Sequence, residues 1–351
     1  MDELPLLGDS VVDDGAAMAA ALALGRTVRR QTSPNPWVGS IVLANGRVVG
    51  MGATDPPGGA HAERLAIDEA ATAVAGSTLF TTLEPCDHEG RTGPCTEAIV
   101  AAGVKRVVVG VEDPDPKVAG RGVASLRAAG LEVEVGVLRD KVVEDLASYL
   151  HHRATGRPYV VLKMASTLDG RTAAPDGTSR WITGSEARAD VHELRADSDA
   201  VCVGAGTVRA DNPRLDIRDL PTGLTSARGA RSAREPRRIV LGSIPEGARV
   251  LPAEEHHGEL GDLLDELGAE GVLQLLVEGG ADVAGRFHRA GLVDRYVIYV
   301  APALLGGEDG RAVMAGCGVP TMNDVWRGTV VHLERLGGDI RIDVTLSRET
   351  E

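Results

Sequence analysis

The amino-acid sequence predicts an α/β protein of two domains, and three observations lead to this fold class. The chain has 351 residues, more than an ordinary single domain, so each half is long enough to bury its own core. Strand-like apolar runs alternate with helix-like runs in both halves, which is typical of sheets covered by helices on two faces. A turn-forming stretch at Ala154–Pro158 separates the two series, so we expect domains over residues 1–154 and 155–351.

The first half begins with an Ala-rich run that predicts a helix over Asp13–Arg30. Two apolar runs joined at Asn45-Gly46 then predict a β-hairpin, because this dipeptide favours the tight turn that twisted strands require. Helical and strand patterns alternate from there to the linker. We expect helices over Ala62–Ala75, Thr96–Ala102 and Arg139–Arg153, and strands over Ser77–Leu83, Val104–Val111 and Leu131–Val137.

The second half shows the same alternation, and we detect no internal repeat. Short apolar runs bounded by turn signals predict a second sheet. We expect strands over Tyr159–Ala165, Ala200–Gly204, Arg238–Gly242, Val272–Val277 and Arg295–Val300, and helices over Ser185–Ala196 and Ala281–Ala290.

The composition narrows the class of partner. The formal net charge of −14 argues against a protein that wraps nucleic acid, since that affinity comes mainly from Lys and Arg on phosphates. Aromatic residues make up only 3% of the chain, too few for a base-stacking platform. The sequence shows neither a signal-peptide pattern nor a membrane span of about 18 apolar residues. We expect a cytoplasmic homo-oligomer with a small-molecule substrate and no nucleic-acid or membrane partner.

The strongest chemical signal is the set His61, Glu63, Cys86 and Cys95. One imidazole and two thiols suit a catalytic zinc site, in which the fourth tetrahedral position is left to a water whose pKa falls to about 7. Glu63 then carries protons as general acid and base. His-x-Glu followed by paired Pro-Cys units is the pattern of zinc nucleobase deaminases, although eight residues separate the cysteines here instead of two. We therefore expect one Zn²⁺ per chain.

Two alternatives apply to this cluster. Free cysteines commonly pack as small buried hydrophobes and would need no metal. A structural zinc site would need a fourth Cys or His, and within this stretch only His88 could complete one. Either alternative would leave Glu63 without a role, which favours the catalytic interpretation.

Two glycine-rich segments follow strands in the second half, at Val203–Thr207 and Val277–Gly280. The second runs into the helix expected over Ala281–Ala290. Such junctions bind phosphates, because free backbone N–H groups and the helix dipole attract anions. Neither segment matches G-x-G-x-x-G, so a Rossmann-type site is not indicated. Close packing of helix on sheet, which also requires small residues, is an equal alternative.

Motifs in both halves are specific enough to indicate a family. In the first half they are Pro34-Asn35-Pro36, His61-Ala62-Glu63, Thr82–Cys86, Gly90–Cys95 and Val118–Gly122; in the second half they are Lys163–Thr172, Ser179–Thr183, Val203–Leu215 and Leu276–Gly280. With these motifs the sequence resembles, over nearly its whole length, the bifunctional riboflavin-biosynthesis deaminase/reductase family. The long loop between the two cysteines is also a feature of that family.

The resemblance implies a cytidine-deaminase-like αβα zinc domain followed by a dihydrofolate-reductase-like α/β domain. The first domain would hydrolyse the exocyclic amine of 2,5-diamino-6-(5-phosphoribosylamino)pyrimidin-4(3H)-one, and the second would use NADPH to reduce the opened ribosyl side chain to ribityl. By motif, the residues facing NADPH would be Ala165, Trp181, Thr207, Asp211, Ser243, Gly280, Ala281, Asp282, Val283, Ala284, Gly285 and Arg286. Those facing the substrate would be Ser179, Arg195, Leu215, Arg218 and Glu278.

The sequence departs from the family pattern in two places. Asp87 and Glu89 add negative charge beside the first metal cysteine, where the family has Ser or Asn and then His or Thr. The segment between Ser243 and Leu260 is shorter than usual, which bears on the edge of the second sheet.

Two other functions stay open at this point. One is a deaminase whose second domain binds a ligand or mediates assembly without reducing anything. The other is a nucleic-acid base deaminase with an accessory domain, which the acidic, aromatic-poor composition disfavours.

Overall fold

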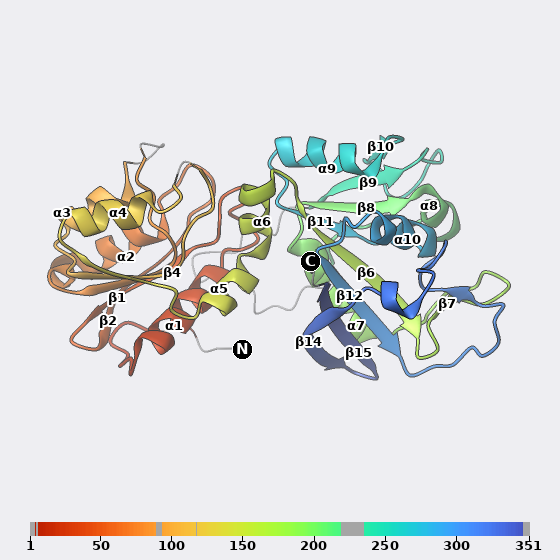
Figure 1. Cartoon of the computed structure of the whole chain (residues 1–351), viewed down its shortest axis with the longest axis horizontal. Helices are drawn as coiled ribbons and strands as arrows, with labels where there is room; N and C mark the ends of the chain where they lie inside the picture. Colours follow the sequence, from red (N-terminus) through yellow and green to blue (C-terminus); the bar gives the residue numbers. More distant parts are fainter. Residues whose placement is uncertain (1–3, 5, 89–92, 117, 219–234, 347–351) are drawn as a thin grey trace. The chain divides into compact units, whose positions relative to one another are not determined.

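The computed structural model describes residues 4, 6–88, 93–116, 118–218 and 235–346 (Figure 1). These residues form two compact units, unit 1 up to Gly156 and unit 2 from Arg157 onward. Glu89 lies outside the described residues, as does the rest of 89–92 in the loop between the cysteines. Among the described helices, none is both long and apolar enough to cross a membrane.

Within the described residues, unit 1 is built on a five-stranded sheet of order β2-β1-β3-β4-β5. The strands are β1 (Gly39–Ala44), β2 (Arg47–Ala53), β3 (Thr78–Leu83), β4 (Arg106–Val111) and β5 (Glu132–Val135). β1 and β2 form the predicted hairpin, with positive φ angles at Asn45 and Gly46. β3, β4 and β5 run parallel, so their carboxyl ends meet at one edge of the sheet.

Helices cover both faces of this sheet. They are α1 (Asp14–Arg26), α2 (Ala62–Ala70), α3 (Cys95–Ala101), α4 (Arg121–Ala128), α5 (Arg139–Asp145) and α6 (Ala147–Thr155), with a 3-10 turn over Ala71–Val74. α2, α3 and α4 share a core with one face, and α1 packs on β1 and β3 from the other (Figure 1). The helix predicted over Arg139–Arg153 is divided, because the backbone leaves the helical region at Leu146.

Glycines in β2 allow α2 to lie very close to the sheet. A Cβ atom at Gly52 would lie 2.1 Å from the carbonyl oxygen of Ala62, and one at Gly50 would lie 2.2 Å from that of Ala66. No side chain fits at such distances, so the two glycines set the helix position. The first turn of α2, which carries Glu63, is held against β2 as a result.

In unit 2 the described residues form an eight-stranded sheet of order β10-β9-β8-β11-β6-β12-β15-β14. The strands are β6 (Tyr159–Thr167), β8 (Ala200–Gly204), β9 (Arg237–Leu241), β10 (Glu254–His256), β11 (Gln274–Val277), β12 (Arg295–Ala301), β14 (Gly328–Leu336) and β15 (Asp339–Leu346), and a separate small ribbon pairs β7 (Arg171–Ala173) with β13 (Arg311–Ala312). The strands from β10 to β12 are parallel, whereas β15 and β14 are antiparallel additions.

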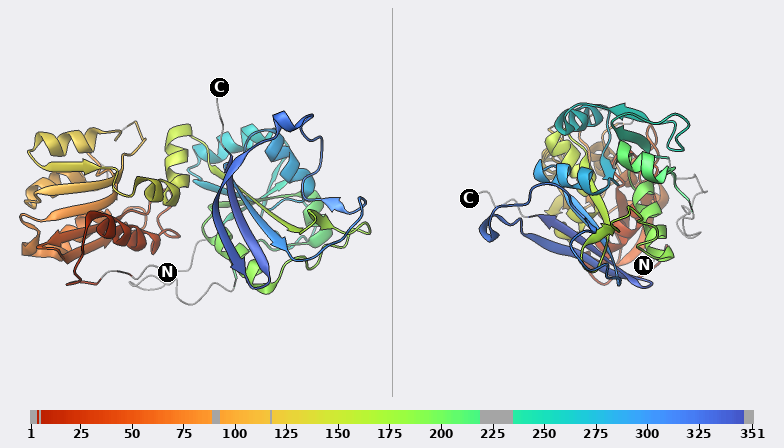
Figure 2. Two further views of the ribbon diagram at one scale, coloured as in Figure 1. Left: turned by 60° about the horizontal axis from the view of Figure 1, so that its bottom comes forward. Right: turned by 90° about the vertical axis from the view of Figure 1, so that its right-hand side faces the viewer.

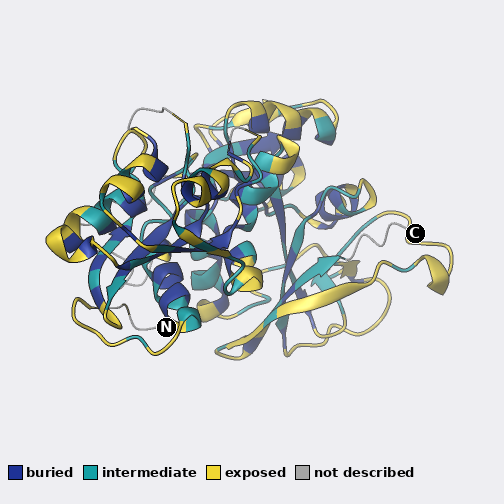
Figure 3. Ribbon diagram, turned by 60° about the vertical axis from the view of Figure 1, so that its left-hand side comes forward, coloured by how far each residue is buried: buried dark blue, intermediate teal, exposed yellow. Residues whose placement is uncertain are grey.

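The parallel part of this sheet is also covered on both faces (Figure 2). The helices are α7 (Ser185–Ala196), α8 (Ala205–Asp211), α9 (Leu260–Ala269) and α10 (Ala281–Arg289), with a 3-10 turn over Met322–Asp324. α9 and α10 share one core cluster with the sheet, and α7 and α8 share another. The central strands are buried between these layers, while the outward faces of the helices are exposed (Figure 3).

Unit 2 contains two features that the sequence analysis did not predict. The hairpin of β14 and β15 was not predicted, although alternating apolar and polar residues flank Gly337-Gly338, which is a hairpin signal. The short segment between Ser243 and Leu260 nevertheless contains β10, which pairs with β9 and completes the edge of the sheet.

We predict that Gly52→Ala destabilises unit 1 by about 1–3 kcal/mol, because the added methyl group meets helix backbone and forces α2 outward. Urea unfolding followed by far-UV circular dichroism would measure the change. Gly338→Ala is the control, since a Cβ atom there meets nothing within 4 Å. An unfolding midpoint for Gly52→Ala equal to that of the unaltered chain would contradict the packing described for α2.

Candidate active sites

His61, Cys86 and Cys95 come together at the carboxyl edge of the sheet in unit 1. His61 immediately precedes α2, Cys86 follows β3, and Cys95 is the first residue of α3. Their ligand atoms all lie within 4.8 Å of one another, with His61 Nδ1 3.3 Å from Cys95 Sγ and 3.5 Å from Cys86 Sγ. A tetrahedral zinc ion places nitrogen and sulfur ligands about 3.5 Å apart, so these side chains fit the metal.

The cluster also offers the chemistry that zinc requires. The hydrogen bond between the two cysteines, with one from His61, lowers the pKa of Cys86 to about 4, whereas the same contact and burial raise the pKa of Cys95. The pair therefore shares one thiolate, the form that binds metal. His88 is exposed and is not part of the cluster, so among the described residues no fourth protein ligand is present. This arrangement is that of a catalytic site, which keeps one position open.

Glu63 lies in the first turn of α2 and is only 4% exposed. It is not a member of the ligand cluster. Burial raises the pKa of Glu63 to about 7, so the carboxyl group can both accept and release a proton near neutral pH. The structure therefore places a buried carboxyl group two residues from a ligand, and its role as proton carrier stays a prediction.

Sequence reasoning missed the residue that anchors this edge, Glu84. Its buried carboxylate accepts hydrogen bonds from the backbone N–H groups of Asp113, Gly120 and Val123. The start of α4 is thereby drawn so close that a Cβ atom at Gly122 would lie 2.0 Å from the Pro85 carbonyl oxygen. The signal was present, since Glu84 and Gly122 both belong to the family motifs quoted above.

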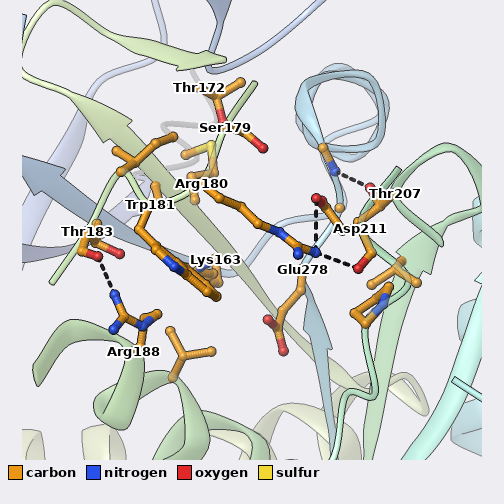
Figure 4. A pocket seen from close by; sticks show the side chains of 18 of the residues that line it. Lys163, Thr172, Ser179, Arg180, Trp181, Thr183, Arg188, Thr207, Asp211 and Glu278 are labelled. Carbon is orange, nitrogen blue, oxygen red and sulfur yellow. Dashed lines mark hydrogen bonds and ion pairs between the residues drawn. The ribbon is translucent and has the colours of Figure 1, made fainter. Parts of the chain in front are cut away.

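Unit 2 contains a second site, a cavity of about 980 Å³ lined by the ends of β6, β8 and β11 and by α7, α8 and the start of α10 (Figure 4). Most of the residues predicted to face NADPH or substrate line it. They are Ala165, Ser179, Trp181, Arg195, Thr207, Asp211, Leu215, Arg218, Glu278, Gly280 and Ala281.

The remaining predicted residues lie outside the lining. Ser243 is exposed after β9, and Asp282 and Arg286 are exposed on α10. Val283 and Ala284 pack in the core under the sheet. Gly285 faces the loop after β13, where a Cβ atom would lie 2.0 Å from the Ala315 carbonyl oxygen. A contact of these residues with NADPH therefore stays a prediction, and close packing accounts for the small side chains of α10.

The charge of the cavity suits phosphorylated ligands. Among the described residues, seven arginines and Lys163 line it, against only two carboxylates, Asp211 and Glu278. Gly280 and Ala281, at the start of α10, also line the cavity, and the Gly280 N–H group donates a hydrogen bond to Thr207 Oγ1 at 3.3 Å. A positive wall beside a helix N-terminus fits the phosphate groups of NADPH and of a ribosyl phosphate.

Arg195 and Glu278, both predicted to face substrate, form a buried ion pair. Arg195 Nε and Nη2 donate to the two oxygens of Glu278 at 2.6 and 2.9 Å, and Nη1 donates to the Asp216 carbonyl oxygen. Although burial opposes ionisation, the guanidinium holds the pKa of Glu278 below its usual value. Arg195 is engaged in this pair and Arg218 pairs with Asp216, so a contact of either guanidinium with the substrate stays a prediction.

Trp181 projects into the cavity and is 71% exposed. The guanidinium groups of Arg188 and Arg180 lie 4.5 and 5.7 Å from its ring, and Arg180 also donates to the Asp211 carbonyl oxygen (Figure 4). Sequence reasoning did not assign a role to either arginine. The signal was their position, since Arg180 precedes Trp181 in the quoted motif and Arg188 lies on the helix that follows.

Comparison with known proteins identifies both domains. The family model of the cytidine and deoxycytidylate deaminase zinc-binding region matches residues 12–111, and that of the RibD C-terminal domain matches residues 158–342. The riboflavin biosynthesis protein RibD of Bacillus amyloliquefaciens is 38% identical, covering 93% of this chain and 94% of its own. This chain belongs to the RibD family.

Solved structures of RibD proteins agree with this assignment. RibD of Acinetobacter baumannii is 36% identical with a TM-score of 0.87, covering 95% of this chain and 99% of its own. The diaminohydroxyphosphoribosylaminopyrimidine deaminase/5-amino-6-(5-phosphoribosylamino)uracil reductase of Thermotoga maritima is 33% identical with a TM-score of 0.81, covering 95% and 98%.

Membership of the RibD family confirms the predicted fold class and the bifunctional interpretation. The chain combines a zinc-dependent deaminase domain with an NADPH-dependent reductase domain. The alternative of a deaminase whose second domain only binds or assembles is not supported, because the match to RibD proteins extends over both domains.

We predict that Arg195→Met destabilises unit 2 by about 3 kcal/mol, because it leaves the Glu278 carboxylate buried without its partner. The pair stabilises the fold fully above the unfolded pKa of Glu278, about 4.5, and this contribution is lost as the pH falls through the lower pKa of the folded state. The penalty measured by urea unfolding should therefore be larger at pH 7 than at pH 4.

Arg218→Met is the matched control, because Arg218 pairs with Asp216 while 48% exposed. It should cost less than about 1 kcal/mol. Equal penalties for the two variants at pH 7 would contradict a special contribution from the buried pair.

Proposed function

We propose that this chain catalyses two consecutive steps of riboflavin synthesis. Residues 1–154 deaminate 2,5-diamino-6-(5-phosphoribosylamino)pyrimidin-4(3H)-one, and residues 155–351 reduce the ribosyl side chain of 5-amino-6-(5-phosphoribosylamino)uracil to ribityl. The observation that carries the proposal is the presence, in one chain, of a His-Cys-Cys cluster beside a buried carboxyl group and of an arginine-lined cavity.

In the deaminase, His61, Cys86 and Cys95 hold the zinc ion. When bound, the metal supplies a water activated for attack on the pyrimidine ring. Glu63 accepts the proton of the attacking water and delivers it to the departing amine, which leaves as ammonia. Burial of Glu63 shields this carboxyl group from bulk water, so the proton is passed within the site.

In the reductase, NADPH supplies the hydride when bound. Thr207, Trp181 and the open start of α10 orient the cofactor. Arg218 binds the phosphate of the substrate, and Glu278 accepts hydrogen bonds from its sugar hydroxyl groups while Arg195 fixes the carboxylate. The site thus acts chiefly by positioning two phosphorylated molecules against each other.

We also propose that the enzyme is a cytoplasmic homo-oligomer that acts on small molecules. Reduced Cys86 and Cys95, which the zinc site requires, support a reducing compartment. The net charge of −14 supports small metabolites over nucleic acid. Self-association is supported by β14, an edge strand on which Val330 and Leu333 are 56% and 68% exposed.

We predict that Glu63→Gln lowers ammonia release from the diaminopyrimidinone by about 10²- to 10⁴-fold, because the amide cannot carry the proton. The assay follows ammonia with and without NADPH, together with the loss of NADPH absorbance. Given predeaminated substrate, the variant should consume NADPH at the unaltered rate.

The same assay on the unaltered chain tests the function itself. Ammonia release that is independent of NADPH, followed by NADPH loss, is the expected order. Ammonia release without any NADPH loss would refute the reductase assignment, and full activity of Glu63→Gln would refute the role of Glu63.

We predict that Leu333→Lys shifts the protein toward the monomer, because a charge on β14 disfavours edge-to-edge contact between two copies. Sedimentation velocity of the full chain would measure the shift. Glu334→Lys, a charge change at the neighbouring residue of the same strand, is the comparison. A monomeric unaltered chain would refute the oligomer proposal without bearing on either activity.

A further inference from the structure

Asp87, the residue that departs from the family pattern beside Cys86, is fully engaged by hydroxyl groups. Its Oδ1 atom accepts a hydrogen bond from Thr96 Oγ1 at 2.6 Å, and Oδ2 accepts one from Ser125 Oγ at 2.7 Å. Asp87 is not part of the ligand cluster. The extra carboxylate therefore accepts hydrogen bonds from one hydroxyl group on α3 and one on α4.

These bonds lie at the base of the loop that separates the metal cysteines. Asp87 follows Cys86, and Thr96 follows Cys95. The backbone adds two contacts at the same level: the Thr96 N–H donates to the Cys86 carbonyl oxygen at 3.2 Å, and the Cys95 N–H donates to Cys86 Sγ at 3.4 Å. These hydrogen bonds join the two ligand residues at the base of the loop. We call this set of contacts, made by Cys86, Asp87, Cys95, Thr96 and Ser125, the neck.

A carboxylate suits this position because both partners donate. Asp offers two acceptor oxygens and can take both hydroxyl protons at once. Asn offers one acceptor and one donor, so one of the hydroxyl groups would have to reverse. Ser125 also ties the neck to α4, the helix whose start Glu84 holds.

We propose that Asp87 is a positioning residue for the zinc site, holding Cys86 and Cys95 at ligand spacing through Thr96 and Ser125. The inference rests on the zinc site of the proposed function. Because folding alone forms these contacts, Cys86 and Cys95 are already at ligand spacing when zinc binds, and the affinity for zinc is higher than it would be without them.

The test measures zinc affinity of the full-length apoprotein by competition with a chromophoric chelator. Asp87→Ala should bind zinc about 10- to 100-fold more weakly, the range found when groups that orient metal ligands are removed. Asp87→Asn should recover part of this loss. Glu97→Ala is the matched control, since it removes an exposed carboxylate from the first turn of α3, and its affinity should change less than about threefold.

Two further readouts separate positioning from general damage. The visible spectrum of the Co²⁺-substituted protein should change in Asp87→Ala, because it reports the geometry of the ligands. NADPH consumption with predeaminated substrate, measured on the same chain, should stay at the unaltered rate. If Asp87→Ala does not fold, Ser125→Ala removes only one bond of the neck and should still weaken zinc binding measurably.

Zinc affinities of Asp87→Ala and Ser125→Ala within twofold of the unaltered chain would overturn the inference. An equal loss in Glu97→Ala would also overturn it, since the effect would then be one of charge alone. Failure of the unaltered chain to bind zinc would instead refute the proposed deaminase.

Discussion

Each unit contains a buried carboxylate at the end of a central parallel strand. Each carboxylate needs hydrogen-bond donors, and the elements that supply these donors are held in place by it. In unit 1, Glu84 follows β3 and takes backbone N–H groups from the segment that leads into α4. In unit 2, Glu278 follows β11 and accepts hydrogen bonds from Nε and Nη2 of Arg195 on α7. An unsatisfied carboxylate in such a place would cost several kcal/mol, so each one fixes its neighbouring elements. Cys86 follows Glu84 by two residues and Arg195 lies on α7, whereas α2, which carries Glu63, is positioned by Gly50 and Gly52 of β2.

Charge is distributed very unevenly in this protein. The chain as a whole is strongly acidic, yet the cavity of unit 2 is lined mainly by arginines. These arginines lie between Arg180 and Arg311 in the sequence, on several different elements. A net charge describes long-range preference for partners, whereas affinity for a phosphate depends on the few cations that converge on one cavity. The acidic composition and the recognition of phosphorylated metabolites are therefore compatible.

Local patterns predicted those parts of the fold whose cause is local. The hairpin at Asn45-Gly46 follows from the turn residues themselves, and the alternation of strands and helices follows from apolar periodicity. The break at Leu146 and the end of α1 at Arg26 were not predicted, because the apolar pattern continues past both points while the backbone leaves the α-helix, after Arg26 in turns with i→i−3 hydrogen bonds. β14 and β15 carried a signal that was overlooked, since their exposed side chains lack the continuous apolar runs of the other strands.

The sequence by itself determined the chemical groups of the sites: an imidazole, two thiols and a spare carboxyl group in one half, and two glycine-rich strand ends in the other. A sequence motif specifies residue types, and the residue types fix which chemical groups are present. Only the tertiary structure decided which groups meet. It paired Arg195 with Glu278, turned Asp87 toward Thr96 and Ser125, and placed Val283 and Ala284 in the core. Such pairings join residues up to 83 positions apart, and the packing of whole elements, which no local pattern encodes, brings them into contact.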